Sequence, residues 1–271
     1  SADLMKFKSI WTTIANRFIN HSDHLIFEII NEPYFELSDS EMDALNTLII
    51  STIRETGGNN TTRSIIITGG TQASYLAPTA IGSAIIQSDD YLIASFHYYQ
   101  PFNFTSSSSS NTNYDEFNWG TETEKSNIIS HFDSVKNWSE TNNIPVTLGE
   151  FGADNFNGIN YVTGIDGDYG GPVNADRVEF HRFVAEQAIN RGFSFSVWCS
   201  GNKSNKTVHL RTDNPETVNA IPGDWVTDVK DALLASGSWP LCYGPTAPAI
   251  ILNPDFECGI LDQWTLFVTG S

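Results

Sequence analysis

The apolar residues of this chain follow two patterns that alternate from the first residues to about position 235. Short unbroken apolar runs are typical of strands buried on both faces of a parallel sheet. Longer segments with an apolar residue at every third or fourth position are typical of amphipathic helices. We predict strands at 25–32, 64–70, 91–99, 145–150 and 193–198, and helices at 3–19, from 38 to the glycines at 57–58, from 121 past 135, at 174–191 and at 224–235.

The alternating order of these elements predicts an α/β fold with a parallel sheet. Two helix starts carry capping boxes, Ser38-x-x-Glu41 and Thr121-x-x-Glu124. Residues 1–238 are expected to form one domain. The Pro- and Gly-containing segment 239–248 is interpreted as a linker, and 249–271 as the start of a truncated β-type module or as a docking strand. The five serines at 106–110 predict a flexible insertion.

Charge narrows the class of partner. The net charge is −18, from 32 acidic and 14 basic residues, which argues against nucleic acid and anionic membranes as partners. A neutral polysaccharide meets no such conflict, although acidity also serves solubility in an extracellular or salty medium. The sequence has no apolar stretch long enough for a transmembrane helix. We find no phosphate loop and no zinc spacing, so we expect no cofactor and no metal.

Two of the predicted strands end in a glutamate, in the sequences Asn31-Glu32-Pro33 and Gly149-Glu150-Phe151. The carboxyl ends of parallel strands are where α/β barrels keep their chemistry. Cleavage of a glycosidic bond needs two carboxyl groups, which stand about 5–5.5 Å apart in retaining enzymes. We therefore predict Glu32 as acid/base and Glu150 as nucleophile. The alternative is that both are solvated residues at strand ends.

Polar and aromatic residues at other strand ends are candidates for substrate binding. His97 and Tyr99 share one face of their strand, so both can reach a carboxylate or a sugar hydroxyl. Asn31 is a candidate ligand of the sugar 2-hydroxyl. Trp119 and Trp198 are candidate stacking platforms for a pyranose ring. The alternative for His97, Tyr99 and the two tryptophans is a place in the core.

Five motifs, taken together and in this order, resemble glycoside hydrolase family 5, the large cellulase family. They are Phe27-Glu28-x-x-Asn31-Glu32-Pro33, His97-Tyr98-Tyr99 with Pro101-Phe102-x-Phe104-Thr105, Trp119-Gly120, Gly149-Glu150-Phe151-Gly152 and Trp198. The resemblance implies a retaining endo-β-1,4-glucanase, with xyloglucan, mixed-linkage glucan or mannan as other substrates. It gives Glu32 and Glu150 the same roles as above. It places Asn31, His97, Tyr99 and Trp198 against the substrate.

The resemblance also implies a (β/α)8 TIM barrel truncated to about five parallel strands with outer helices. In the family the Asn-Glu-Pro strand is the fourth of eight, whereas here it is the first. Five strands cannot close such a barrel. We therefore expect a homo-oligomer that closes the open barrel, unless the tail or another chain fills the gap. The expected location is extracellular, and the alternative to an enzyme is a non-catalytic or weakly active glucan-binding remnant.

Overall fold

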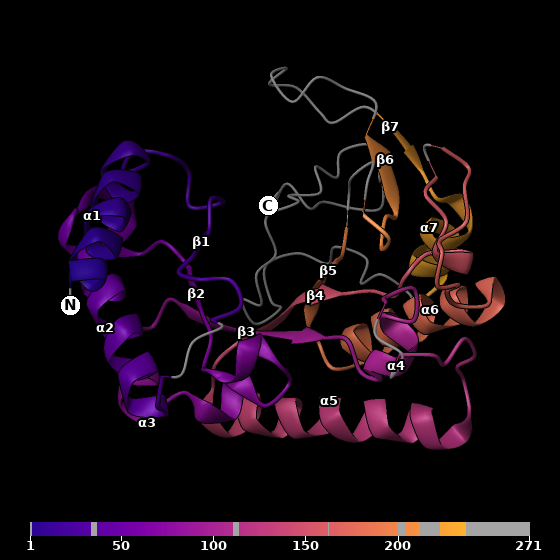
Figure 1. Ribbon diagram of the computed structural model, residues 1–271. Helices are drawn as coiled ribbons and strands as arrows, with labels where there is room; N and C mark the ends of the chain where they lie inside the picture. The colour runs from indigo at the N-terminus through magenta and orange to yellow at the C-terminus, as the bar shows by residue number, and fades with distance from the viewer. Residues whose placement is uncertain are drawn as a thin grey trace. The chain divides into compact units, whose positions relative to one another are not determined.

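The computed structural model describes residues 2–33, 37–110, 114–161, 163–199, 204–211 and 223–236. Figure 1 shows the elements in chain order. The helices are α1 (Ala2–Arg17), α2 (Asp39–Glu55), α3 (Ser83–Ile86), α4 (Phe102–Thr105), α5 (Glu122–Asn142), α6 (Asn174–Asn190) and α7 (Thr227–Ala235). The strands are β1 (Phe27–Glu28), β2 (Ile65–Ile67), β3 (Leu92–Tyr98), β4 (Val146–Phe151), β5 (Ser194–Val197), β6 (His209–Arg211) and β7 (Gly223–Trp225).

The five main strands form one sheet in the order β1-β2-β3-β4-β5. Pairing between neighbours is parallel, with Phe27 opposite Ile65 and Ile67 opposite Ala94. Strands that follow one another in sequence are therefore also neighbours in the sheet. This confirms the predicted fold class, a (β/α) TIM-barrel type truncated to five parallel strands with helices between them. The small antiparallel sheet of β6 and β7 was not predicted from the sequence.

The described chain divides into two compact units. Unit 1 contains residues 2–97 and 134–147, and unit 2 contains residues 98–133 and 148–236. Strands β3 and β4 contribute residues to both units, because the boundaries fall at His97 and Thr147. In unit 1 the helices α1 and α2 lie side by side (Figure 1).

Helix α1 buries a narrower face than its sequence predicts. Trp11 and Ala15 are buried, and the Trp11 Nε1 donates to the Ile29 carbonyl at 3.1 Å. Ile10, an apolar residue of the same helix, is 54% exposed. One turn of helix thus anchors α1 to the chain just beyond β1.

The first strand is much shorter than predicted. The apolar run spans 25–30, yet β1 contains only Phe27 and Glu28. One more ladder bond follows, from the Ile29 amide to the Ile66 carbonyl at 3.1 Å. Beyond it the backbone leaves the sheet, so Glu32 lies in a loop that begins at the end of β1 rather than within a strand.

Both predicted capping boxes are present. The Ser38 amide donates to Glu41 Oε2 at 2.8 Å and the Glu41 amide returns a bond to Ser38 Oγ at 3.4 Å. The Thr121 and Glu124 side chains make the same reciprocal pair at 2.8 and 3.3 Å. Such pairs satisfy amide groups that the first helical turn leaves without an acceptor. They fix where α2 and α5 begin.

The serine run at 106–110 is part of the packed structure, which makes the prediction of a flexible insertion wrong. Ser107 is 1% exposed, and Ser108 donates to Asp154 Oδ2 from its amide at 2.8 Å and from its hydroxyl at 2.5 Å. Small hydroxyl side chains fit this tight turn because they bond to neighbouring groups. The predicted linker 239–248 and the segment 249–271 lie outside the described residues. Within those residues, no helix combines the length and the apolar content of a membrane span.

Candidate active site

In unit 1, Glu32 and His97 are in direct contact. The His97 Nδ1 lies 2.7 Å from Glu32 Oε1, and the ring nitrogen carries the proton when Glu32 is ionised. The His97 side chain is 3% exposed within β3, whereas that of Glu32 is 38% exposed. A buried histidine thus holds a glutamate that remains open to solvent. Asn31, the preceding residue, is exposed.

In unit 2, Tyr99 and Glu150 are in direct contact. The Tyr99 hydroxyl donates to Glu150 Oε2 at 2.8 Å. Glu150 is the penultimate residue of β4, and Tyr99 directly follows β3. Both residues are half-buried. A donor of this kind stabilises the ionised carboxylate. Each unit therefore holds one of the two predicted carboxylates together with its own ring partner.

The two predicted tryptophans occupy different surroundings. Trp198 directly follows β5 and is half-buried, and its amide donates to the Phe151 carbonyl at 2.8 Å. Trp119 is 5% exposed and packs edge-on against Phe180 with ring centroids 5.2 Å apart. Its buried Nε1 has no hydrogen-bond partner within the described residues. Trp119 therefore takes the core position that the sequence left open, and it offers little ring surface to a sugar.

Asp154 and Lys206 form a buried ion pair in unit 2 that the sequence did not single out. The Lys206 Nζ lies 2.5 Å from Asp154 Oδ1; the lysine side chain is 14% exposed and the aspartate 0%. The lysine ammonium also lies 5.9 Å from the centroid of the Tyr99 ring. The only signal in the sequence was the position of Asp154, four residues after Glu150, because Lys206 is distant in the chain.

Cys199 is a buried free thiol. Burial raises the pKa of this thiol, a hydrogen bond from Ser204 and the charge of Lys206 act to lower the pKa, and the charge of Glu150 acts to raise it. The thiol is therefore kept in its neutral form near the Glu150 carboxylate. A raised pKa disfavours the reactive thiolate.

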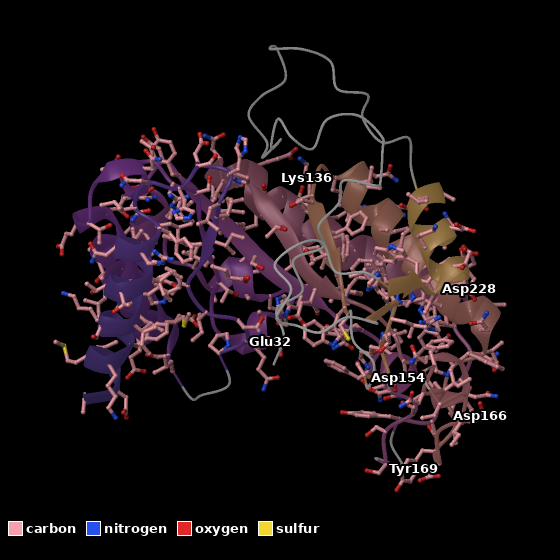
Figure 2. All side chains as sticks on the ribbon, turned by 90° about the horizontal axis from the view of Figure 1, so that it is seen from above. Glu32, Lys136, Asp154, Asp166, Tyr169 and Asp228 are labelled. Atoms are coloured by element: carbon pink, nitrogen blue, oxygen red, sulfur yellow. The ribbon has the colours of Figure 1, made fainter. Side chains whose placement is uncertain are left out.

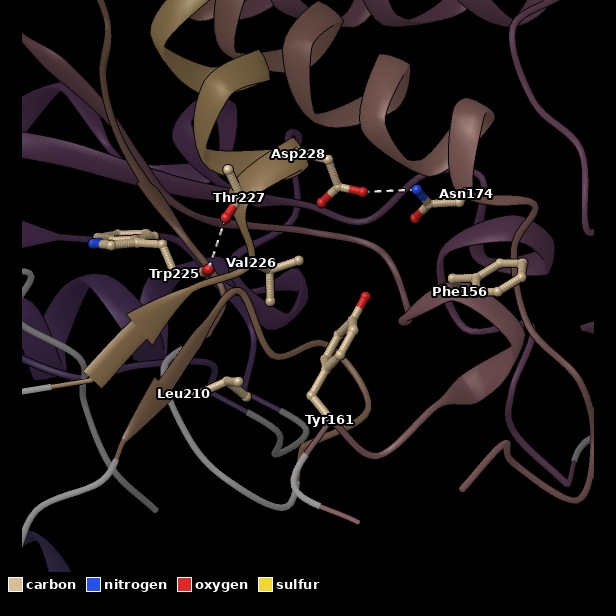
Figure 3. Close-up of a pocket in the computed structure, with 8 residues that line it drawn as sticks. All are labelled: Phe156, Tyr161, Asn174, Leu210, Trp225, Val226, Thr227 and Asp228. Carbon is tan, nitrogen blue, oxygen red and sulfur yellow. Dashed lines mark hydrogen bonds between the residues drawn. The ribbon is translucent and has the colours of Figure 1, made fainter. Parts of the chain in front are cut away.

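Unit 2 also contains an open pocket of about 520 Å³. Figure 3 shows its lining residues, which are Phe156, Tyr161, Asn174, Leu210, Trp225, Val226, Thr227 and Asp228. Tyr161 directs its hydroxyl toward the side of the pocket that holds Asp228 and Asn174, and Asn174 Nδ2 donates to Asp228 Oδ2 at 2.7 Å. The predicted site residues are not among those that line this pocket, so it is a separate feature.

A parallel α/β sheet that carries glutamates at strand ends is an arrangement typical of barrel glycoside hydrolases. The family model described as cellulase, glycosyl hydrolase family 5, matches residues 2–204. The chain therefore belongs to glycosyl hydrolase family 5, as its motifs predicted.

Relatives with known names agree with this family. Endoglucanase H of Acetivibrio thermocellus is 34% identical over 241 residues, which are 89% of this chain and 23% of that protein. Endoglucanase A of Clostridium longisporum is 31% identical over 245 residues, or 84% of this chain and 42% of that protein. The chain thus spans less than half the length of these two relatives.

Solved structures show the same fold. A hyperthermophilic endo-β-1,4-glucanase in complex with substrate superposes with a TM-score of 0.67 at 28% identity, over 84% of this chain and 64% of that one. The cellulose synthase subunit Z of Clostridioides difficile gives a TM-score of 0.69 at 27% identity, over 86% and 68% of the two chains.

Proposed function

We propose that this chain hydrolyses β-1,4-glucan chains with retention of configuration, using Glu32 as acid/base and Glu150 as nucleophile. Family membership and relatives named endoglucanases support β-glucan hydrolysis. The observation that carries the residue roles is the bond from the Tyr99 hydroxyl to Glu150 Oε2 at 2.8 Å. This bond supports the proposal because a donated hydrogen bond fixes the position of the carboxyl group and favours the ionised form that a nucleophile requires.

In the proposed reaction the two glutamates act in two steps, and each is oriented by its own ring partner. In the first step the Glu150 carboxylate attacks the anomeric carbon while the Glu32 carboxyl group gives its proton to the departing glycosidic oxygen. In the second step Glu32, now a carboxylate, takes a proton from water, and the resulting hydroxide displaces Glu150. His97 orients Glu32 and Tyr99 orients Glu150. Both partners come from the end of β3, two residues apart in the chain.

Trp198 and Asn31 are proposed to bind the glucan. Trp198 is half-buried directly after β5, and Asn31 is exposed and precedes Glu32 in the chain. Aromatic faces bind sugars because one face of a pyranose is apolar. Mannan, xyloglucan and mixed-linkage glucan remain the alternative substrates.

The test is release of reducing sugar from carboxymethylcellulose, lichenan, xyloglucan and mannan. We expect Glu32→Gln to lower the rate about 10²- to 10⁴-fold, because general acid–base catalysis contributes that much. Glu150→Gln should lose at least as much. The matched control is Glu122→Gln, an exposed residue in the first turn of α5, which should keep the wild-type rate. Equal sugar release by the wild type and Glu150→Gln would overturn the proposal.

A second candidate function is glucan binding without cleavage, which the five-stranded sheet favours, since a closed barrel has eight. Retarded migration in a gel containing carboxymethylcellulose, without sugar release, would distinguish it.

We further propose a secreted protein in which a second copy closes the sheet. Light scattering coupled to size exclusion tests the second copy, and an active species of monomeric mass would contradict it.

A further inference from the structure

Thr105 connects three segments of unit 2 around Tyr99. Its hydroxyl donates to the Tyr99 carbonyl at 2.6 Å. Its own carbonyl accepts two bonds, from the Asp154 amide at 2.9 Å and from the Lys206 Nζ at 2.6 Å. Thr105 is fully buried. The segment after β3 is thereby fastened to the segment after β4 and to the one before β6.

The ion pair of Asp154 and Lys206 fixes this junction. The three hydrogens of the ammonium meet three acceptors, namely Asp154 Oδ1 at 2.5 Å, the Thr105 carbonyl and Ser106 Oγ at 3.3 Å. The second carboxylate oxygen of Asp154 accepts the amide and the hydroxyl of Ser108. A carboxylate that is fully buried requires such a set of partners. Neither charge can therefore move without breaking several bonds.

The chain of contacts leads from this pair to the proposed nucleophile. Lys206 bonds to Thr105, Thr105 bonds to the Tyr99 backbone, and the Tyr99 hydroxyl bonds to Glu150. The Lys206 ammonium also approaches the Tyr99 ring itself, at 5.9 Å from its centroid. Lys206 thus reaches the Tyr99 backbone through Thr105 and approaches the Tyr99 ring directly.

We propose that Asp154 and Lys206 are positioning residues that hold the Tyr99 hydroxyl on Glu150 through Thr105. This inference rests on the proposed function, because it concerns the nucleophile of that reaction. Misplacement of a reacting group by about 1 Å can cost about 10²-fold in rate. A loosened Tyr99 also removes a donor that favours the ionised carboxylate. The charges of Lys206 and Glu150 both act on the neighbouring Cys199 thiol, the first lowering and the second raising its pKa.

The first test is Lys206→Gln, with kcat and KM measured on carboxymethylcellulose. We expect kcat to fall about 10- to 100-fold, the equivalent of one hydrogen bond to a charged group, and KM to change less than about twofold. The matched control is Lys136→Gln (Lys136 is labelled in Figure 2), which removes a surface lysine that pairs with Glu140 at 3.3 Å. The control should keep both constants. An unchanged kcat in Lys206→Gln would overturn the inference.

The second test asks whether Lys206 acts through Tyr99. In a Tyr99→Phe background the hydroxyl is already absent, so Lys206→Gln should lower kcat less than about threefold. The same fold loss in both backgrounds would show that the pair acts elsewhere and would overturn the inference. If Lys206→Gln fails to fold because Asp154 is left unpaired, the neutral double variant Asp154→Asn/Lys206→Gln replaces it with the same expected losses.

A third measurement does not depend on turnover. The carboxyl carbon of Glu150 is followed by ¹³C NMR in glutamate-labelled protein and assigned from its loss in Glu150→Gln. We expect Lys206→Gln to move its titration midpoint to higher pH, and to move it less in the Tyr99→Phe background. An equal movement in both backgrounds would refute positioning through Tyr99. A chain that folds, titrates as expected and releases no sugar would refute the proposed function while upholding this inference.

Discussion

Replacement of Arg63 by methionine should destabilise unit 1 by more than any surface change. Arg63 is fully buried between the end of α1 and β2. Its guanidinium lies 5.0 Å over the Phe27 ring. It donates five hydrogen bonds, to Asn60 Oδ1 (2.7 Å) and to the carbonyls of Phe18 (3.1 Å), His21 (2.9 Å), Ser22 (2.7 Å) and Leu25 (2.6 Å).

The magnitude follows from these five bonds. Each is worth about 0.5–1.5 kcal/mol net, and an acceptor left buried without a donor costs about 1–3 kcal/mol. Burial lowers the pKa of the Arg63 guanidinium, and this desolvation offsets part of the gain. Methionine keeps most of the apolar stem. We therefore expect Arg63→Met to lower the free energy of unfolding by about 4 kcal/mol.

The assay is urea unfolding followed by circular dichroism at neutral pH. Arg17→Met is the matched control, because Arg17 is exposed in the last turn of α1. The control should change the free energy of unfolding by less than about 0.5 kcal/mol. Arg63→Lys should fall between the two, since an ammonium has only three donors. A loss below about 1 kcal/mol in Arg63→Met would show that the carbonyls find other donors and would refute this reasoning.

Two further predictions concern helix α2 and the buried histidine of α6. Ser38→Ala removes the side chain that caps α2 and should lower the free energy of unfolding by about 1 kcal/mol, whereas Ser51→Ala in the exposed middle of α2 should have a smaller effect. Burial, followed by the charge of Arg177, lowers the pKa of His181 from 6.5 to about 3. As pH falls, His181 therefore binds a proton in the unfolded chain before it does so in the folded one. Its contribution to the free energy of unfolding is complete above pH 6.5 and is lost toward pH 3. Between pH 7 and 4.5 the wild type should lose about 2–3 kcal/mol more than His181→Phe, and equal losses in urea unfolding would contradict this.

Local signals in the sequence predicted the five strands of the main sheet, the five longer helices and their order. The strands predicted at 64–70 and 91–99 became β2 and β3, each slightly shorter than predicted, and the capping boxes at Ser38 and Thr121 marked the starts of two helices. The end of β1 was not predictable, because the same apolar run continues into a loop packed beneath α1. The strands β6 and β7 were missed because each has three residues, too few for a periodic pattern.

Contacts between distant residues were beyond the reach of these patterns. His97 and Glu32 are 65 positions apart, and their direct bond follows from the folding of the sheet, in which β2 lies between β1 and β3, rather than from either local sequence. Lys206 and Asp154 are 52 positions apart, and neither belongs to a recognisable motif. Trp119 gave no local sign of whether it would face a sugar or the core. The serines at 106–108 looked like an insertion because their partners lie elsewhere in the chain.

The most direct test of the proposed chemistry is trapping of the covalent intermediate. A 2-deoxy-2-fluoro-β-cellobioside with a good leaving group reacts with a retaining nucleophile and is released slowly, because the fluorine destabilises the positively charged transition state of both steps. Digestion and mass spectrometry then locate the sugar. The proposed mechanism predicts one cellobiosyl group on the peptide that contains Glu150, and no label in Glu150→Gln. A folded protein that takes no label, or carries it on another residue, would contradict it.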